Sequence, residues 1–210
     1  VAGGSGSDFI RTFGLPQSPE AGVKHLQGDN LYQIDVGRVT YNLGGRRVSE
    51  YFPNIAEAGF GADVVRTAER LPRFVGRVRY LLGFWATLVS FKINEGRVLL
   101  DGRPYEGPIT NVVVANAQFF GGGMHIAPKA HPGDGRFDVL IQKGTKRDYV
   151  AGITKVFKGE HLSSPAIRLY HASVVEVVTP KPLRVEADGE LLGVTPATFE
   201  IVPGALQLKL

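Results

Sequence analysis

Alternation between apolar and polar side chains is the first regular pattern along this chain. Such alternation runs from Leu31 to Val39 and predicts a strand with one buried face. Residues 42–45, which include two glycines, have the composition of a turn. Arg46–Phe52 is then predicted to return as the second strand of a hairpin.

Apolar residues three or four positions apart form a second pattern, which predicts helices. The longest instance is Phe74–Val89, where a stripe of apolar residues includes Trp85. Between the first helix and the first strand, Pro16 and Pro19 indicate a polar linker. The other predicted helices are a short one around Phe9–Phe13, Ala62–Leu71 and Asp148–Phe157.

Short apolar segments separated by glycine and proline turns fill most of the remaining chain. Over its second half they recur about every ten residues, which is typical of a sandwich or a barrel. We therefore expect an α+β fold dominated by an antiparallel β-sandwich with a few helices. The further predicted strands are Phe91–Asn94, Arg97–Leu100, Ile109–Asn116, Phe137–Gln142, Val174–Thr179, Leu183–Ala187, Thr198–Val202 and Leu206–Leu210.

Composition narrows the class of protein without choosing a function. Of 210 residues, 43% are hydrophobic and 21% are charged, which is ordinary for a globular protein and argues against disorder. Cysteine is absent, which excludes disulfides, thiolate metal sites and a cysteine nucleophile. The net charge of +4 suits an anionic partner such as a phosphate, a nucleotide or a lipid headgroup, and is too small to indicate nucleic acid.

Two glycine-rich segments are candidate sites because glycine lets a backbone approach a ligand closely. The first precedes the first predicted helix, whose N-terminal N–H groups would point at a phosphate. Its candidate phosphate-binding residues are Gly4, Ser5, Gly6, Ser7 and Asp8. The second is Gly121–Gly123, which follows a predicted strand. A plain loop and a wide turn are the alternative interpretations.

Two acidic segments are candidates for metal binding and for proton transfer. His131–Arg136 is a turn by composition, and its Asp134 could hold a hard cation together with backbone carbonyls. Glu186, Asp188 and Glu190 would share one face of a regular strand, where crowding raises the pKa of at least one carboxyl and suits it to act as a general base. The alternative for both segments is an ordinary solvated turn.

Five blocks of sequence carry a resemblance to a known family. They are Gly4–Gly14, Ile34–Gly37 with Phe52–Asn54 and Gly59–Ala62, Asn116–Ala130 with Asp134–Val139, Asp188–Glu190 and Val202–Leu206. In this order they resemble the diacylglycerol kinase-like lipid kinases, the family that also holds the sphingosine and ceramide kinases. The first block is similar to that family's Gly-Thr-Gly-Asn-Asp-Phe-Ala-Arg segment.

The resemblance implies a fold in two parts. Residues 1–25 would be the end of a nucleotide-binding α/β domain, and residues 26–210 the β-sandwich domain that bears the acidic catalytic loop. The family's Gly-Gly-Asp-Gly-Thr loop, which cradles the phosphates of ATP, is absent from this sequence. The 210 residues are therefore expected to be a fragment that is inactive alone.

The resemblance also implies roles for the candidate residues. Glu190 would accept the proton of the lipid hydroxyl, with Asp188 beside it as a second catalytic carboxylate. Asp134 would hold a structural Mg²⁺, completed by the backbone carbonyls of His131 and Arg136. The first glycine-rich segment would lie toward ATP, the implied phosphate donor, with a catalytic Mg²⁺.

The implied function is ATP-dependent transfer of the γ-phosphate to a lipid hydroxyl, such as that of diacylglycerol, by a cytoplasmic enzyme bound peripherally to a membrane. The Phe74–Val89 helix with Arg73, Arg77 and Arg79 is the candidate membrane surface, and a core helix with solvated arginines is the alternative. No nucleic-acid partner is expected, and a homodimer stays open. An NAD kinase-like enzyme and a non-catalytic lipid-binding module also stay open.

Overall fold

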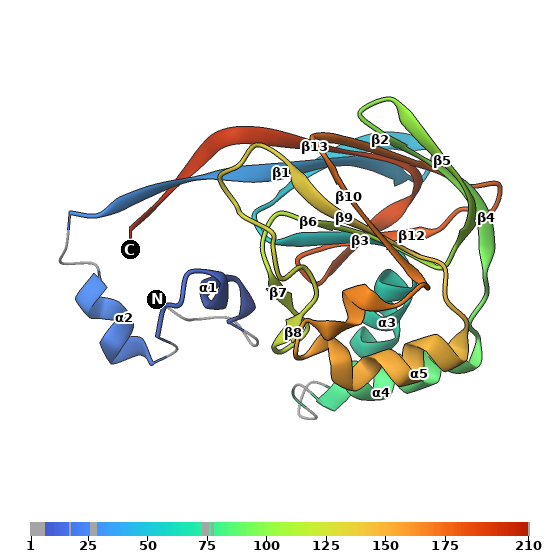
Figure 1. Cartoon of the computed structure of the whole chain (residues 1–210), viewed down its shortest axis with the longest axis horizontal. Coiled ribbons are helices and arrows are strands. Elements are labelled where there is room, and N and C mark those ends of the chain that lie inside the picture. Colours follow the sequence, from blue (N-terminus) through green and yellow to red (C-terminus); the bar gives the residue numbers. More distant parts are fainter. Residues whose placement is uncertain (1–6, 17, 26–28, 73–75, 77, 210) are drawn as a thin grey trace.

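The computed structural model describes residues 7–16, 18–25, 29–72, 76 and 78–209 (Figure 1). The helical elements are α1 (Asp8–Thr12), α2 (Pro19–His25), α3 (Phe60–Glu69), α4 (Val78–Val89), α5 (Lys146–Val156) and the 3-10 turn η2 (Glu160–Ser163). The strands are β1 (Leu31–Leu43), β2 (Arg46–Phe52), β3 (Ile55–Gly59), β4 (Asn94–Leu100), β5 (Arg103–Ile109), β6 (Asn111–Ala115), β7 (Phe119–Phe120), β8 (Met124–His125), β9 (Phe137–Gln142), β10 (Ile167–Ala172), β11 (Val174–Val178), β12 (Arg184–Ala187) and β13 (Glu190–Lys209).

Eleven of these strands pair into one antiparallel sheet that curls on itself (Figure 1). Their order is β10-β9-β6-β3-β12-β13-β11-β4-β5, with β1 paired to β13 and β2 paired to β1, while β7 and β8 form a separate pair. The long strand β13 joins the parts of the sheet, since it pairs in turn with β12, β11 and β1. The predicted fold class, an α+β chain dominated by antiparallel strands, is confirmed.

The central strands of the sheet are buried on both faces. Every residue of β3 and β6 is buried. Ala56 and Val112 point into the main core enclosed by the curled sheet, whereas Ile55 and Val113 point the other way, into a second apolar cluster. A polar side chain on that second face therefore lies among apolar neighbours.

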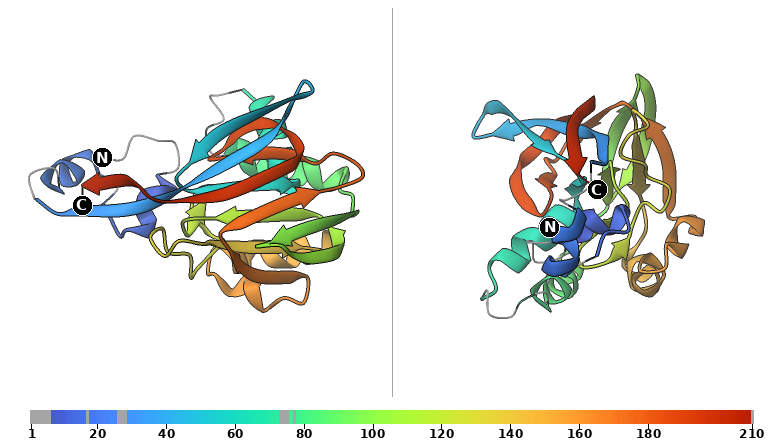
Figure 2. Two further views of the ribbon diagram at one scale, coloured as in Figure 1. Left: turned by 90° about the horizontal axis from the view of Figure 1, so that it is seen from above. Right: turned by 90° about the vertical axis from the view of Figure 1, so that its left-hand side faces the viewer.

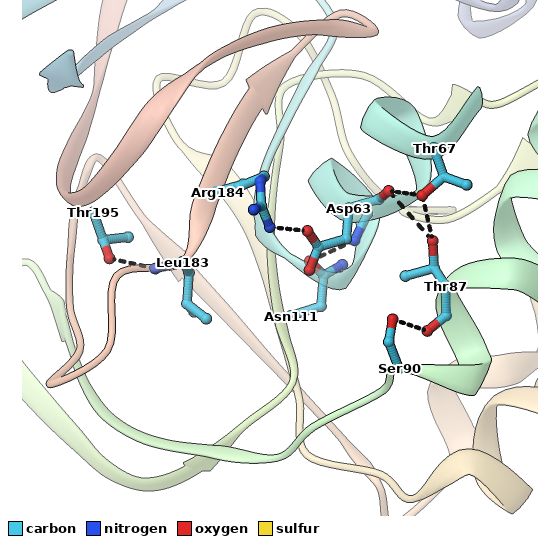
Figure 3. Close-up of polar contacts among 9 residues, drawn as sticks. Asp63, Thr67, Thr87, Ser90, Asn111, Leu183, Arg184 and Thr195 are labelled. Carbon is cyan, nitrogen blue, oxygen red and sulfur yellow. Dashed lines mark hydrogen bonds and ion pairs between the residues drawn. The ribbon is translucent and has the colours of Figure 1, made fainter. Parts of the chain in front are cut away.

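Helices α3, α4 and α5 lie together on one side of the sheet, and α1 and α2 lie near the projecting ends of β1 and β13 (Figures 1 and 2). Polar contacts tie α3 to its neighbours: Arg184 of β12 forms an ion pair with Asp63, and the hydroxyl of Thr67 lies 3.1 Å from that of Thr87 in α4 (Figure 3). Within the described part of the chain, no helix combines the length and the apolarity needed to cross a lipid bilayer.

The two predicted strands at the end of the chain are one strand, β13, and a bulge explains the difference. The register on β1 shifts from Val36 opposite Val202 to Ile34 opposite Leu206. The carboxylate of Asp35 stands at this shift and accepts the backbone N–H of Gly204 at 2.8 Å. A bulge absorbs extra residues without ending the strand, so the proline and glycine turn signal at residues 203–204 was misleading.

Other predicted elements differ in extent or kind. The expected strand Arg97–Leu100 is present as part of β4, which begins earlier, at Asn94, whereas the expected strand Phe91–Asn94 is wrong except at its last residue. The expected strand Ile109–Asn116 covers the last residue of β5 and the whole of β6. The expected polar linker contains helix α2. Strands β3 and β10 were not predicted, since they are short and lack a clear alternation. The other predicted strands and all four predicted helices are present with shifted ends, and the domain division at residue 25 stays a prediction.

Phe52 occupies the centre of the main core. Its ring stacks on that of Phe137 with centroids 5.8 Å apart, and meets Phe199 edge-on at 6.4 Å. Gly37 lies directly against the ring of Phe52, where a Cβ atom would collide with it. The core is therefore closed around one aromatic side chain.

Replacing Phe52 with Ala is expected to lower the free energy of unfolding by about 3–5 kcal/mol, because the buried ring is lost and a cavity remains. Urea unfolding followed by circular dichroism measures the change. The matched control is Tyr51→Ala, an aromatic residue on the same strand that is 65% exposed, with an expected loss below about 1 kcal/mol. Equal losses for the two variants would contradict this account of the core.

Candidate functional site

A cavity of about 1070 Å³ lies among helices α3, α4 and α5 and the strands beneath them. Most of its lining side chains are apolar or aromatic and come from all three helices and the sheet. A cavity of this size and lining suits a ligand with a substantial apolar part. The lining includes Ile55, Phe60, Val64, Val65, Leu81, Phe84, Ile126, Ile153, Val156, Phe157 and Ile167.

Two buried carboxyl groups face each other in the lining of this cavity. Glu57 of β3 stands directly opposite Glu186 of β12, and both are almost fully buried. Asn111 of β6 donates from Nδ2 to Oε1 of Glu57 at 2.7 Å. The backbone N–H of Gly189 donates to Oε2 of Glu186 at 2.9 Å. Gly61 leaves room for the pair, because a Cβ atom there would collide with the Glu57 carboxyl.

The two carboxyl groups also lie close enough to influence each other's ionisation. Burial raises the pKa of Glu57 to about 7, although the hydrogen bond from Asn111 opposes the shift. Burial, and after it the charge of Glu57, raises the pKa of Glu186 well above its usual range. Two ionised carboxylates repel each other where burial leaves them poorly solvated, so the pair favours a state that keeps a proton. Near neutral pH the Glu57–Glu186 pair therefore holds a shared proton.

The tight turn after β12 carries both predicted catalytic carboxylates. Asp188 and Gly189 have positive φ angles of 49° and 86°, as expected for an Asp-Gly hairpin turn. Oδ1 of Asp188 accepts the backbone N–H of Ile55 at 2.9 Å. Burial raises the pKa of Asp188 to about 6, despite the lowering effect of its backbone hydrogen bonds. Asp188 lines the cavity and titrates close to neutral pH.

Glu190, the predicted proton acceptor, lies on the outer side of the same turn. It begins β13 opposite Ala187, and both its side chain and that of Asp188 are exposed to solvent in part of their surface. It is not among the residues that line the cavity, whereas Asp188 is. A molecule in the cavity therefore meets the carboxylate of Asp188 rather than that of Glu190.

Helix α1 and the segment Gly121–Gly123 are in contact beside the cavity. Asp8 of α1 accepts the backbone N–H of Gly122 through Oδ2 at 2.7 Å, and the guanidinium of Arg11 lies 3.4 Å from its other oxygen. Gly121–Gly123 all have positive φ angles, of 59°, 87° and 109°, which requires glycine. Gly121–Gly123 therefore forms a wide turn, and the N-terminal helix α1 approaches it closely. Ser7 and Asp8 line the cavity.

The predicted magnesium turn lies outside the cavity lining. Oδ2 of Asp134 lies 3.2 Å from Nε of Arg136, and the carbonyl of His131 accepts the N–H of Gly133 at 2.7 Å. Nowhere among the described residues do three His, Asp or Glu side chains gather as a metal cage. One carboxylate with backbone carbonyls is, however, the share a protein commonly gives to Mg²⁺, which keeps several waters. In this turn Arg136 engages both carboxylate oxygens of Asp134, through its backbone N–H and its Nε, and the magnesium site stays a prediction.

The structure brings only part of the predicted site together. Ser7, Asp8 and Asp188 line one cavity, while His131, Asp134, Arg136 and Glu190 do not. Gly4, Ser5 and Gly6 lie outside the described residues. The predicted role of each of these residues stays a prediction.

Sequence reasoning missed Glu57 and Asn111, which complete the polar part of the cavity. The available signal was a single acidic residue inside the otherwise small and apolar segment Ile55–Gly59. A charge in a segment buried on both faces requires a partner. The partner itself could not be found, because β3 was not predicted and its pairing with β12 was unknown.

Known proteins resemble this chain along most of its length. A family model described as the YegS C-terminal NAD kinase beta sandwich-like domain matches residues 54–210. A diacylglycerol kinase of Mycobacterium tuberculosis is 30% identical over 211 residues, which cover 99% of this chain and 67% of the relative. A Pseudomonas aeruginosa protein named "Probable lipid kinase YegS-like" is 31% identical, with 99% and 66% covered. The chain thus spans about two thirds of the length of these relatives.

Solved structures share the fold. A diacylglycerol kinase from Bacillus anthracis strain Sterne superposes with a TM-score of 0.67 at 20% identity, covering 99% of this chain and 64% of that one. Another structure from the same strain gives a TM-score of 0.72 at 23% identity, covering 99% and 66%. At these identities the likeness concerns the fold alone.

The shared proton makes stability depend on pH in a defined direction. The pKa of Glu57 is about 7 in the folded protein against an ordinary 4.5, so the folded state binds more protons between these values. The stabilising contribution of the protonated pair is complete below about pH 4.5 and is lost as pH rises through about 7. We expect the free energy of unfolding to fall by on the order of 1–3 kcal/mol between about pH 5 and pH 8.

Glu57→Gln is expected to reduce this pH dependence, because an amide does not titrate in that range, while Glu186 and Asp188 keep raised pKa values. Urea unfolding at a series of pH values measures the slope. Glu176→Gln, an exposed residue on β11, is the matched control and should keep the slope of the unmodified protein. A slope that is unchanged in Glu57→Gln would show that the pair does not cause it.

Proposed function

Since this chain belongs to the diacylglycerol kinase and YegS-like lipid kinase family, we propose that it binds the lipid acceptor of an ATP-dependent kinase. The proposed reaction transfers the γ-phosphate to a lipid hydroxyl, such as that of diacylglycerol. The observation that carries this proposal is an apolar cavity of about 1070 Å³ with carboxyl groups in its lining. Acyl chains suit the apolar wall, and a hydroxyl suits the carboxyls.

The same lining favours a lipid over the dinucleotide of an NAD kinase. A dinucleotide carries two phosphates and two sugars, which need many polar partners. Apolar side chains of α3, α4 and α5 supply most of the wall instead. The alternative of a non-catalytic lipid-binding module is separated from a kinase by the activity measurements below.

The Asp188–Gly189–Glu190 turn would supply the proton acceptor. Asp188 is the better candidate for the proton acceptor, because it lines the cavity and has a pKa of about 6. A general base works best when its pKa lies close to the working pH. The backbone N–H of Ile55 holds its Oδ1 in place, and the backbone of Asn54 also donates to the carboxylate. Glu190, on the outer side of the turn, is the carboxylate that the family resemblance favours.

ATP, when bound, would supply the phosphoryl group, and Mg²⁺ would neutralise its charge. Ser7 and Asp8, which line the cavity on the side of α1, are the described residues that we assign toward the phosphate donor. A structural Mg²⁺ would be held by the carboxylate of Asp134 and the carbonyls of His131 and Arg136. The relatives are half as long again as this chain, so catalysis is assigned to the full-length protein.

We also propose that α4 rests on a membrane, from which the lipid would enter the cavity. The helix exposes Val78, Leu81, Leu82, Trp85 and Val89, which are 45% to 79% exposed. Leu81 and Phe84 of the same helix line the cavity, so the exposed apolar face adjoins it. Such a face suits peripheral binding at the cytoplasmic side of a bilayer, where ATP is available. Arg73, Phe74 and Arg77 lie outside the described residues.

In the full-length enzyme, Asp188→Asn is expected to lower kcat at least about 100-fold, because a positioned general base contributes that much. Transfer of radiolabel from γ-labelled ATP to dioleoylglycerol in mixed micelles measures the rate. In the unmodified enzyme kcat/KM should rise with pH through about 6, as Asp188 loses its proton.

Glu190→Gln distinguishes the two carboxylates of the turn. A loss confined to Glu190→Gln would transfer the role of proton acceptor to that residue. Activity retained by both variants would exclude both carboxylates of the turn as the proton acceptor. Absence of activity in the unmodified full-length protein would favour a non-catalytic lipid-binding module. Arg97→Gln, at an exposed residue on β4, is the control and should leave the rate unchanged.

Leu82→Gln combined with Val89→Gln is expected to weaken binding to vesicles at least tenfold, since each exposed apolar side chain contributes about 1–2 kcal/mol of burial in a membrane. Sedimentation with vesicles of phosphatidylcholine and phosphatidylglycerol measures the bound fraction.

Val178→Gln is the matched control for vesicle binding. Val178 is 46% exposed but lies on β11, away from α4, and its replacement should leave binding unchanged. Equal binding by the double variant and the unmodified protein would exclude α4 as the membrane-contacting helix.

A further inference from the structure

We propose that the Glu57–Glu186 pair determines acceptor specificity, and that it favours a lipid whose polar end carries two or more hydrogen-bond donors. Diacylglycerol carries only one. The inference rests on the proposed function and narrows the class of acceptor. It gives a role to two buried carboxyls for which the transfer of phosphate itself has no use.

Acceptor capacity at the pair exceeds the donors that the protein supplies. The four carboxyl oxygens receive Asn111 Nδ2 and the Gly189 N–H, and they share one proton between them. The orientation of Asn111 is set, because its Oδ1 accepts the N–H of Gly61 at 3.2 Å. Since each carboxylate oxygen can accept two hydrogen bonds, lone pairs remain for a molecule in the cavity.

The charge of the pair also lacks a cation nearby. With one shared proton the pair carries a net negative charge, which is costly among apolar neighbours unless donors or a cation compensate for it. Among the described residues that line the cavity, the positively charged one is Lys155, and its side chain is exposed. Arg184, on the same strand as Glu186, is engaged by Asp63 (Figure 3). Compensation is therefore left to the ligand.

An unpartnered atom elsewhere in the lining independently indicates a ligand rich in donors. His161 is 4% exposed, and its Nε2 lies 3.0 Å from the carbonyl oxygen of Ile126. A carbonyl only accepts, so Nε2 carries the proton, and burial lowers the pKa of this ring and keeps it neutral. Nδ1 is then a buried acceptor without a partner, in a residue that lines the cavity.

Oδ1 of Asn54, another lining residue, is likewise a buried acceptor without a partner, because its Nδ2 donates to the carbonyl of Phe119 at 3.0 Å. Buried polar atoms are normally paired. A ligand that brings donors would satisfy these acceptors, whereas the ester carbonyls of diacylglycerol would not.

Binding to the 210-residue chain tests the inference without requiring catalysis. Trp85 is the single tryptophan and packs edge-on against Phe84 of the cavity wall with centroids 5.4 Å apart, so its fluorescence should report occupancy. The probes are 1-O-dodecylglycerol, with two hydroxyls, and 2-dodecyloxyethanol, with one. They carry the same alkyl chain. A third probe, 1-amino-3-dodecyloxypropan-2-ol, replaces one hydroxyl of the diol by an ammonium group.

The two-donor probes are expected to bind about tenfold tighter than 2-dodecyloxyethanol, because each adds a hydrogen bond to a charged acceptor. In the Glu57→Gln, Glu186→Gln double variant this ratio should fall below about threefold. Glu186→Gln alone, which keeps the bond between Asn111 and Glu57, should give an intermediate ratio. Glu176→Gln should keep the ratio of the unmodified chain. Far-ultraviolet circular dichroism verifies that each variant is folded.

Equal affinities for the three probes in the unmodified chain would overturn the inference and leave the proposed lipid-binding function standing. A tenfold ratio that persists in the double variant would also overturn it. Failure of every probe to bind would overturn both the inference and the proposed lipid cavity. A preference for the ammonium probe over the diol would support the inference and identify an amino alcohol as the acceptor class.

Discussion

Two carboxyl groups placed opposite each other on paired, buried strands cannot both remain ionised. Glu57 and Glu186 meet in this way, among neighbours that offer little solvation. Like charges directly across a strand pair destabilise it, and a buried charge is costly without a partner. A shared proton, the amide of Asn111 and the N–H of Gly189 relieve the repulsion. These groups form the polar part of the cavity.

The surrounding fold keeps the pair enclosed and close to a ligand. Strands β3 and β6 are buried on both faces and form one wall around the pair. Helices α3, α4 and α5 supply the other walls of the cavity. Gly61 makes space for one carboxyl, since a side chain there would overlap it. The Asp188 turn is attached to the same strands through the N–H of Ile55. The pair, the proposed proton acceptor and the apolar wall thus belong to one rigid arrangement, which suits selection of a particular acceptor lipid.

Much of the fold and a smaller part of the site could be predicted from the sequence. The hairpin of β1 and β2 was predicted because its alternation and its turn are local signals. The two segments of β13 were separated wrongly, because the bulge at Asp35 that unites them depends on a partner strand far away in the sequence. Asp188 was found through the three alternating acidic residues at 186–190 and through the family resemblance, whereas Glu57 gave only a weak signal.

The sequence by itself determined the strand-rich fold class, the turn chemistry of residues 188–189 and the family resemblance, because these depend on neighbouring residues and on motifs in order. Only the tertiary structure decided that Glu57 faces Glu186 and that Asp188, rather than Glu190, lines the cavity. The physical reason is register: a side chain reaches one face of a strand or the other according to its pairing. Pairing between strands distant in sequence is set by the packing of the whole sheet.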